Sequence, residues 1–114
     1  MVKPVPKTKV CRGDVWLACL DPTQGAEIQK TRPCLVVSPP EIHDFLRTAL
    51  IVPMTSKGFP APFRISIEFS GKAGLLLLDQ IRVVDKSWLV KRLGAVEDDV
   101  LKSALDTMQE LFAG

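Results

Sequence analysis

The sequence has few of the residues that bind metal ions or act as nucleophiles. It contains one histidine, His43, and three cysteines, Cys11, Cys19 and Cys34, whose odd number and spacing match neither a zinc motif nor a redox pair. It has no glycine-rich loop of the phosphate-binding kind. We therefore interpret the cysteines as reduced thiols and expect neither a metal site nor a cofactor. His43 lies in a polar segment, and we interpret it as a solvated surface residue.

Long apolar segments are also absent. The longest apolar run, residues 74–78, has the length of a strand, whereas a membrane-spanning helix needs about 20 apolar residues. The basic residues 1–10 are interrupted by Pro4 and Pro6 and are not followed by an apolar segment of the signal-peptide type. These absences predict a cytoplasmic protein that does not bind membranes.

The charge is distributed unevenly. The net charge is +2, but residues 97–114 contain five acidic residues and one basic residue. Residues 1–96 therefore carry 14 basic against 8 acidic side chains, a net charge of +6. A basic body favours a polyanionic or acidic partner.

Short apolar runs separated by turn residues predict a mainly β protein. Residues 63–70 alternate between apolar and polar side chains, which is typical of a half-buried antiparallel strand. Apolar residues recur at helical spacing in residues 100–112, so a C-terminal amphipathic helix should follow. We expect a flexible basic segment at residues 1–11 and a single domain at residues 12–114. The other expected strands are residues 14–20, 34–37, 50–54, 75–78 and 81–84, with a helical turn at 41–46.

Polar residues stand at the ends of these apolar runs. Such residues are often turn formers or satisfied structural groups, so the pattern alone leaves structural and functional roles open. The candidates are Glu27 and Arg32 around the first loop, Thr55 and Ser56 after the third strand, and Asp79 and Gln80 within the run LLLLDQIRVV.

Several short motifs occur in an order and at a spacing that resemble those of the MazF/PemK toxins. They are R-G-D-V-W at 12–16, D-P-T-Q-G-A-E at 21–27, R-P-C-L-V-V-S at 32–38, V-P-M-T-S at 52–56, L-D-Q-I at 78–81, D-K at 85–86 and R-L-G at 92–94. The resemblance implies a small SH3-like β-barrel of the CcdB/PemK/MazF type with a C-terminal helix. It also implies a homodimeric endoribonuclease that cuts single-stranded RNA at short sequences. The implied partner is a MazE-like antitoxin whose acidic, disordered segment blocks the RNA groove, and DNA would be bound only through the toxin–antitoxin complex.

The resemblance also suggests which residues form the site. Arg32 and Thr55 match the catalytic pair of the family, and Glu27 matches its loop glutamate. Asp79 matches an acidic position that some relatives use, although certain relatives place an arginine two positions earlier, where this chain has Leu77. The residues expected to bind RNA or support the site are Ser56, Asp79, Gln80, Lys57 and Lys30.

In such enzymes the 2′-hydroxyl of the RNA is expected to attack the adjacent phosphorus without a metal ion. By hypothesis, Arg32 stabilises the phosphate charge, Thr55 donates to a non-bridging oxygen and Glu27 accepts the 2′-proton. The products would be 2′,3′-cyclic phosphate and 5′-hydroxyl ends. Because one fold can serve several functions, two alternatives stay open. They are a non-enzymatic gyrase inhibitor like CcdB and a nucleic-acid-binding regulatory barrel.

Overall fold

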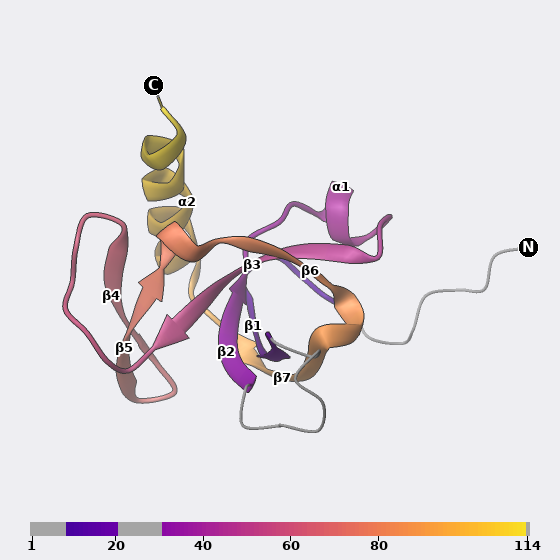
Figure 1. The fold of residues 1–114 in the computed structure, drawn as a ribbon, viewed down its shortest axis with the longest axis horizontal. Coiled ribbons are helices and arrows are strands. Elements are labelled where there is room, and N and C mark those ends of the chain that lie inside the picture. The colour runs from indigo at the N-terminus through magenta and orange to yellow at the C-terminus, as the bar shows by residue number, and fades with distance from the viewer. Residues whose placement is uncertain (1–8, 21–30, 114) are drawn as a thin grey trace, which may run out of the picture.

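The computed structural model describes residues 9–20 and 31–113, and these form seven strands and a C-terminal helix (Figure 1). The expected mainly β fold with a terminal helix is confirmed. Strand β7 is not among the expected strands. The elements are β1 (Asp14–Cys19), β2 (Thr31–Val36), α1 (Pro40–His43), β3 (Thr48–Thr55), β4 (Arg64–Phe69), β5 (Lys72–Leu77), the 3-10 turn η3 (Leu78–Gln80), β6 (Arg82–Asp85), the 3-10 turn η4 (Lys86–Trp88), β7 (Leu89–Ala95) and α2 (Asp98–Phe112).

The strands form one antiparallel sheet in the order β4-β5-β3-β2-β1-β7, and β6 pairs with β3 beside this path. The two ends of the sheet come together. A Cβ atom added to Gly94 of β7 would lie only 3.1 Å from the Cζ atom of Phe69 in β4. The sheet is therefore curled into a small barrel whose closing contact depends on the missing side chain at position 94.

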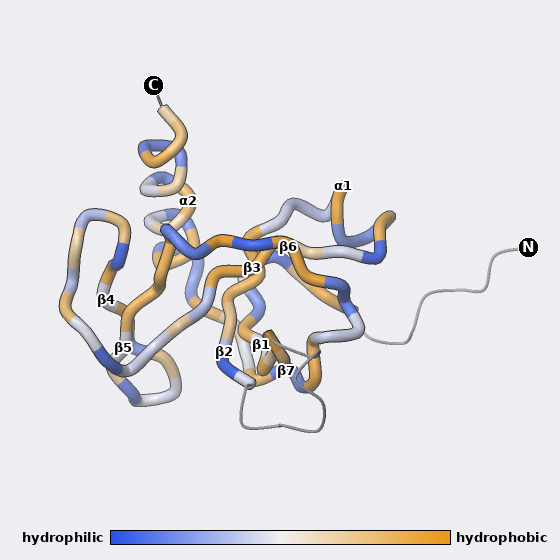
Figure 2. The backbone as a smooth tube through the Cα atoms, viewed as in Figure 1, coloured by the Kyte–Doolittle hydropathy of each residue, from blue (hydrophilic) through white to orange (hydrophobic). Residues whose placement is uncertain are grey.

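Both faces of the central strands are buried. Consecutive side chains along a strand point to opposite faces. Val15 and Val52 pack on one face together with Met108 of α2. Their neighbours Trp16 and Ile51 pack in a second cluster on the other face. Two-sided burial explains why these strands read as continuous apolar runs, which Figure 2 shows along β2, β3 and β5.

The aspartate of the R-G-D-V-W motif has a structural role. Asp14 is 3% exposed, and its carboxylate accepts hydrogen bonds from the Cys11 backbone N–H at 2.9 Å and from the Trp16 indole N–H at 3.3 Å. Arg92 of β7 forms an ion pair with the same carboxylate at 3.1 Å. A buried charge is tolerated only when it is paired and hydrogen-bonded, as it is here. Asp14 thus joins β1 to β7.

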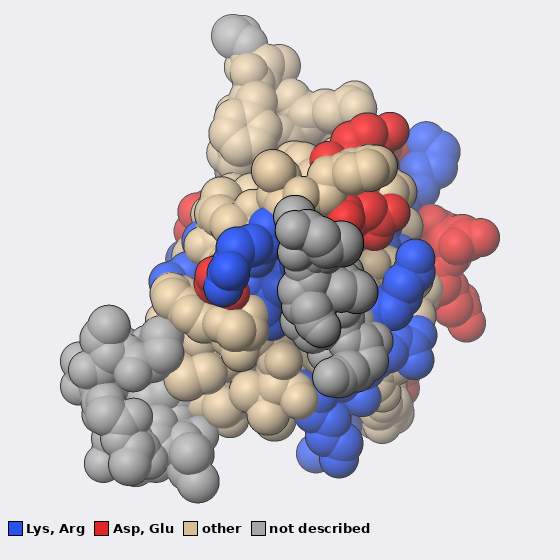
Figure 3. Space-filling model, turned by 90° about the vertical axis from the view of Figure 1, so that its right-hand side faces the viewer, with Lys and Arg blue, Asp and Glu red and all other residues tan. Residues whose placement is uncertain are grey.

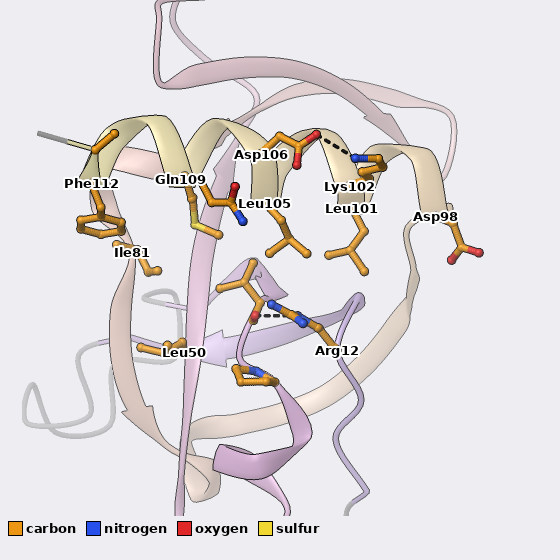
Figure 4. Close-up of a pocket in the computed structure, with 14 residues that line it drawn as sticks. Arg12, Leu50, Ile81, Asp98, Leu101, Lys102, Leu105, Asp106, Gln109 and Phe112 are labelled. Carbon is orange, nitrogen blue, oxygen red and sulfur yellow. Dashed lines mark hydrogen bonds and ion pairs between the residues drawn. The ribbon is translucent and has the colours of Figure 1, made fainter.

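The amphipathic helix α2 lies across one side of the barrel. Its side chains Leu101 and Leu105 point toward Leu50 and Arg12 around a hollow of about 760 Å³ (Figure 4). The Arg12 side chain donates a hydrogen bond to the Val37 carbonyl oxygen at this hollow. Among the described residues, no helix is long and apolar enough to cross a membrane.

The three cysteines are free thiols, as expected. Cys34 is fully buried, and this burial raises the pKa of its thiol to about 12, with the nearby Arg32 charge acting in the opposite direction. A thiol with such a pKa stays protonated at neutral pH and is a poor nucleophile.

The interpretation of His43 as a solvated surface residue is wrong, because the residue is only 2% exposed. Its Nδ1 atom lies 2.8 Å from the hydroxyl oxygen of the buried Ser38, and its carbonyl oxygen accepts a hydrogen bond from Lys86. The error has a physical cause. Helix α1 is a single turn with one buried side chain, and one residue produces no periodicity that a sequence pattern would reveal.

The burial of His43 predicts that the protein loses stability in mild acid. Desolvation is the main cause of a lowered pKa for this imidazole; Lys86 and Lys9 also lower it, whereas the charges of Asp44 and Asp14 oppose the shift. Between its unfolded pKa of about 6.5 and its lower folded pKa, the unfolded chain binds more protons. The free energy of unfolding should therefore be constant above about pH 7 and fall as the pH drops below 6.5.

Melting temperatures measured between pH 8 and pH 5 test this expectation. His43→Asn is a suitable control because asparagine offers Ser38 an acceptor and does not titrate. The wild-type melting temperature should fall more steeply with acid than that of the variant. Parallel curves for the two proteins would assign the acid sensitivity to other groups.

Candidate active site

Two of the residues singled out in the sequence come together through the register of β2 and β3. Cys34 of β2 is paired with Pro53 of β3. Arg32 lies two residues before Cys34, and Thr55 lies two residues after Pro53. Because the strands are antiparallel, the two residues emerge beside one another on the same face of the sheet. Both residues border one hollow of about 560 Å³. Residues 23 positions apart in the chain are thus neighbours because of the antiparallel pairing.

The hollow lies where β2, β3, β4, β5 and β7 approach one another, and Arg32 and Thr55 are among its lining residues. Its lining is largely apolar and includes Met54 and Phe69, with Leu93 contributed by β7. Lys72 of the β4–β5 hairpin also lines it. A surface that combines an apolar interior with cations at its edge suits a nucleotide, which has an apolar base face and a charged phosphate.

The position of Thr55 depends on a close approach of β5. A Cβ atom at Gly74 would lie 2.8 Å from the carbonyl oxygen of Thr55, a distance too short for real atoms. Thr55 is also paired with Leu75 across the same two strands. The absence of a side chain at position 74 therefore lets β5 hold the end of β3 in place.

Arg32 differs from the other arginines in its contacts. The guanidinium of Arg32 makes no hydrogen bond, ion pair or ring contact with another described residue. Pairing of an arginine with a carboxylate would occupy its planar donor fork, which suits phosphate as well as carboxylate. Arg32 is therefore available for an anionic ligand. The partners of the other five are the Val37 carbonyl for Arg12, Asp85 for Arg47, Asp79 for Arg64, the Trp88 ring for Arg82 and Asp14 for Arg92.

The Thr55 hydroxyl is oriented by the loop that follows it. Its oxygen accepts a hydrogen bond from the backbone N–H of Lys57 at 3.2 Å. A hydroxyl group has one proton and two lone pairs. The bond from Lys57 uses one of the lone pairs and leaves the proton available for donation to a ligand.

The remaining predicted residues are placed less closely together. Ser56 borders the same hollow as Thr55, and Lys57 is exposed next to it. Gln80 is exposed in η3 and does not line the hollow. Glu27 and Lys30 lie outside the described residues. The structure thus brings together Arg32, Thr55 and Ser56.

Lys72 and Leu93 border the hollow but were not among the residues predicted from the sequence. Lys72 follows a two-residue turn, Ser70-Gly71, in which both residues have positive φ angles of 54° and 78°. Such turns join adjacent strands in tight hairpins. The serine–glycine pair was a visible signal for the hairpin, but the face that Lys72 borders depends on how the barrel closes.

One face of the molecule carries described side chains of both signs of charge. On the face shown in Figure 3, basic and acidic side chains are interspersed. Within the described part of the chain, no three His, Cys, Asp or Glu side chains gather closely enough to hold a metal ion.

The profile of a protein family described as "PemK-like, MazF-like toxin of type II toxin-antitoxin system" matches residues 11–112. The chain belongs to this family. The match spans both strands that carry the Arg32–Thr55 pair and the whole of α2. The membership inferred from the ordered sequence motifs is thereby confirmed.

Individual relatives in the PemK/MazF family agree with this assignment. The chain is 35% identical to Endoribonuclease PemK of Escherichia coli over 112 residues, which cover 93% of this chain and 84% of PemK. The crystal structure of MazF from Deinococcus radiodurans has a TM-score of 0.71 and 28% identity, covering 96% of this chain and 97% of that one. A MazE–MazF structure from the same organism has a TM-score of 0.71 and 25% identity, covering 97% and 98% of the two chains. The barrel is therefore the MazF fold.

Asp79, which matches an acidic position of the PemK/MazF family, is bound by Arg64 of β4. Arg64 donates to both carboxylate oxygens at 2.9 and 2.8 Å, and this hydrogen-bonded pair lowers the pKa of Asp79. Arg64 is paired in register with Leu77, the position at which certain relatives have an arginine. Since directly opposite residues share a face, Arg64 supplies a guanidinium close to where an arginine at position 77 would emerge.

Proposed function

We propose that this chain is the toxin of a type II toxin–antitoxin pair and acts in the cytoplasm as a sequence-specific endoribonuclease on single-stranded RNA, without a metal ion. The observation that carries the proposal is the Arg32–Thr55 pair, in which the guanidinium has no partner among the described residues and the hydroxyl has a proton to donate. The family membership and the similarity to Endoribonuclease PemK support the same conclusion.

In the proposed reaction the 2′-oxygen of the RNA attacks the adjacent phosphorus while the bond from phosphorus to the 5′-oxygen breaks. Arg32 faces the non-bridging oxygens as their charge grows, and Thr55 donates a hydrogen bond to one of them. Glu27 accepts the 2′-proton, and the leaving 5′-oxygen takes a proton from solvent. The products carry a 2′,3′-cyclic phosphate and a 5′-hydroxyl. DNA lacks the attacking group and is not cut.

The other residues have supporting roles in this proposal. Ser56, Lys57 and Lys30 bind the RNA chain near the cut. Asp79 is a positioning residue, because its low pKa makes it a weak base and its two oxygens hold Arg64. Arg64 and Gln80 then bind RNA farther along the sheet.

Incubation of the pure protein with a long unstructured RNA in EDTA tests the proposal. Specific cuts with cyclic phosphate and 5′-hydroxyl ends are expected. A second substrate with one 2′-deoxy nucleotide at a mapped cut should resist cleavage at that site only. Binding without cleavage would support the regulatory barrel instead, and inhibition of gyrase supercoiling without cleavage would support the CcdB-like alternative.

We also propose that the chain forms a homodimer and binds a MazE-like antitoxin through an acidic, disordered segment. The solved MazE–MazF structure of Deinococcus radiodurans supports a partner of this kind, and the +6 charge of residues 1–96 suits an acidic segment. RNA and an acidic antitoxin peptide should exclude one another, and both should bind more weakly as salt rises. Scattering in solution gives the subunit count. A monomer at micromolar concentration, or simultaneous binding of RNA and peptide, would overturn this part.

A further inference from the structure

The hollow beside the Arg32–Thr55 pair is also bordered by Lys72, which stands at the end of a tight hairpin. Lys72 is paired directly with Phe69 across the β4–β5 hairpin. The Ser70-Gly71 turn that joins them has positive φ angles at both residues, a geometry that matches the twist of the flanking strands and fixes the register. The backbone of Lys72 is therefore held by the hairpin rather than by a long loop.

Lys72 is exposed and has no structural role that would explain its charge. No carboxylate of a described residue lies within ion-pair distance of its ammonium group. Lys102, by contrast, pairs with Asp106 at 3.1 Å, and Lys86 donates to the His43 carbonyl oxygen. An unpaired ammonium at the edge of a largely apolar hollow is a place for a phosphate.

The position of Lys72 relative to the cut follows from the strand register. Leu75 is the partner of Thr55, and Lys72 precedes Leu75 by three residues. At about 3.3 Å per residue, its Cα lies about 10 Å along the strand from the row that contains Thr55. Because side chains alternate along a strand, Lys72 emerges on the face of Phe69, opposite to the face of Leu75 and Thr55. Lys72 and Arg32 therefore approach the hollow that both border from different faces of the sheet, which places them to bind different phosphates.

Between these positions the hollow is apolar. Phe69 and Leu93 line it from β4 and β7, and Leu93 is 37% exposed. Proteins that bind single-stranded RNA combine cations along the backbone with apolar or aromatic surfaces for the bases. The lining of this hollow contains both cations and an aromatic ring.

We infer that this hollow is a nucleotide subsite next to the cut, in which Lys72 binds a phosphate adjacent to the scissile one and the base lies against Phe69 and Leu93. The inference rests on the proposed function and names residues that it does not contain. Lys72 binds substrate and takes no part in proton transfer. Its loss should raise KM and leave kcat nearly unchanged.

The test compares Lys72→Gln and Lys72→Arg with Lys91→Gln, which removes an exposed lysine of β7 that does not border the hollow. Lys72→Gln should raise KM about tenfold, Lys72→Arg should stay near wild type, and Lys91→Gln should change little. In a plot of log binding constant against log salt concentration, the slope should become shallower by about 0.7 for Lys72→Gln and should not change for the other two variants. A thermal melt checks that each variant is folded.

A second measurement locates the phosphate. A short single-stranded RNA with one phosphate at a time replaced by a neutral methylphosphonate is bound to Arg32→Ala protein, which should cut it about 10²–10³-fold more slowly than wild type. Neutralising one phosphate beside the cut should weaken RNA binding to the Arg32→Ala protein about tenfold. The same change in the RNA should have little effect on a protein that carries both Arg32→Ala and Lys72→Gln. The inference is wrong if each methylphosphonate weakens RNA binding equally for the proteins with and without Lys72→Gln. It is also wrong if Lys72→Gln lowers kcat and leaves KM unchanged. If wild-type protein fails to cut RNA, the proposed function fails, while this binding comparison still tests Lys72.

Discussion

Replacement of Arg32 by alanine is expected to slow RNA cleavage by about 10²–10³-fold while the protein stays folded. The residue is exposed and its guanidinium makes no hydrogen bond or ion pair with another described residue, so the fold should lose little. In the proposed reaction this side chain faces the phosphate oxygens as their charge grows, and alanine provides no donor in its place. Single-turnover cleavage of a mapped RNA site, measured beside a thermal melt, separates activity from folding.

Two further substitutions show whether charge or geometry matters. Arg32→Lys keeps the charge and loses the planar fork, so its rate should lie between those of alanine and wild type. Arg47→Ala removes the same charge from a side chain that is 86% exposed at the opposite end of β3, and it should cut at nearly the wild-type rate. Near-wild-type cleavage by folded Arg32→Ala protein would remove Arg32 from the mechanism.

The second large effect is expected at Thr55. Thr55→Val keeps the branched shape that suits a strand and removes only the hydroxyl group, so cleavage should fall by about 10²-fold or more. Thr55→Ala should be similarly impaired. Thr55→Ser keeps a proton donor and an acceptor for the Lys57 N–H, so it should retain substantial activity. Single-turnover rates of the three variants give this order directly.

A purely structural role for Thr55 makes a different prediction. The hydroxyl accepts a hydrogen bond that helps to hold the start of the β3–β4 loop, so valine could lower stability without affecting chemistry. Melting temperatures measured for the same preparations decide between the two roles. A Thr55→Val protein that melts early but cuts RNA at the wild-type rate when folded would show that Thr55 only ends a strand.

Most of the fold could be predicted because its strands and helix carry strong local patterns. Strands β2 and β3 are runs of apolar, β-branched residues, and α2 repeats its apolar residues at helical spacing. Strand β7 has no such pattern. Val90 and Leu93 are 59% and 37% exposed and are separated by two charged residues. An edge strand of this kind is defined by its pairing with β1, which no local pattern contains.

The site was predictable to a smaller extent. Composition and spacing alone left structural roles open for Arg32, Thr55 and Asp79, and the family resemblance selected them. The geometry of Arg32 and Thr55 depends on sheet register, and the pairing of Arg64 with Asp79 depends on how η3 lies beside β4. Lys72 could not be assigned to the hollow because its neighbours there come from four different strands. Contacts between distant segments exist only once the barrel has closed.

Strand β3 has partners along both of its edges, with β2 on one side and β6 and β5 in succession on the other. A strand held in this way separates only when the whole sheet opens, so its amide protons should exchange with solvent at the rate of global unfolding. An inhibitor is therefore not expected to act by melting the segment that ends at Thr55; it has to cover the surface. When that cover is removed or degraded, the enzyme beneath it is still folded and active at once.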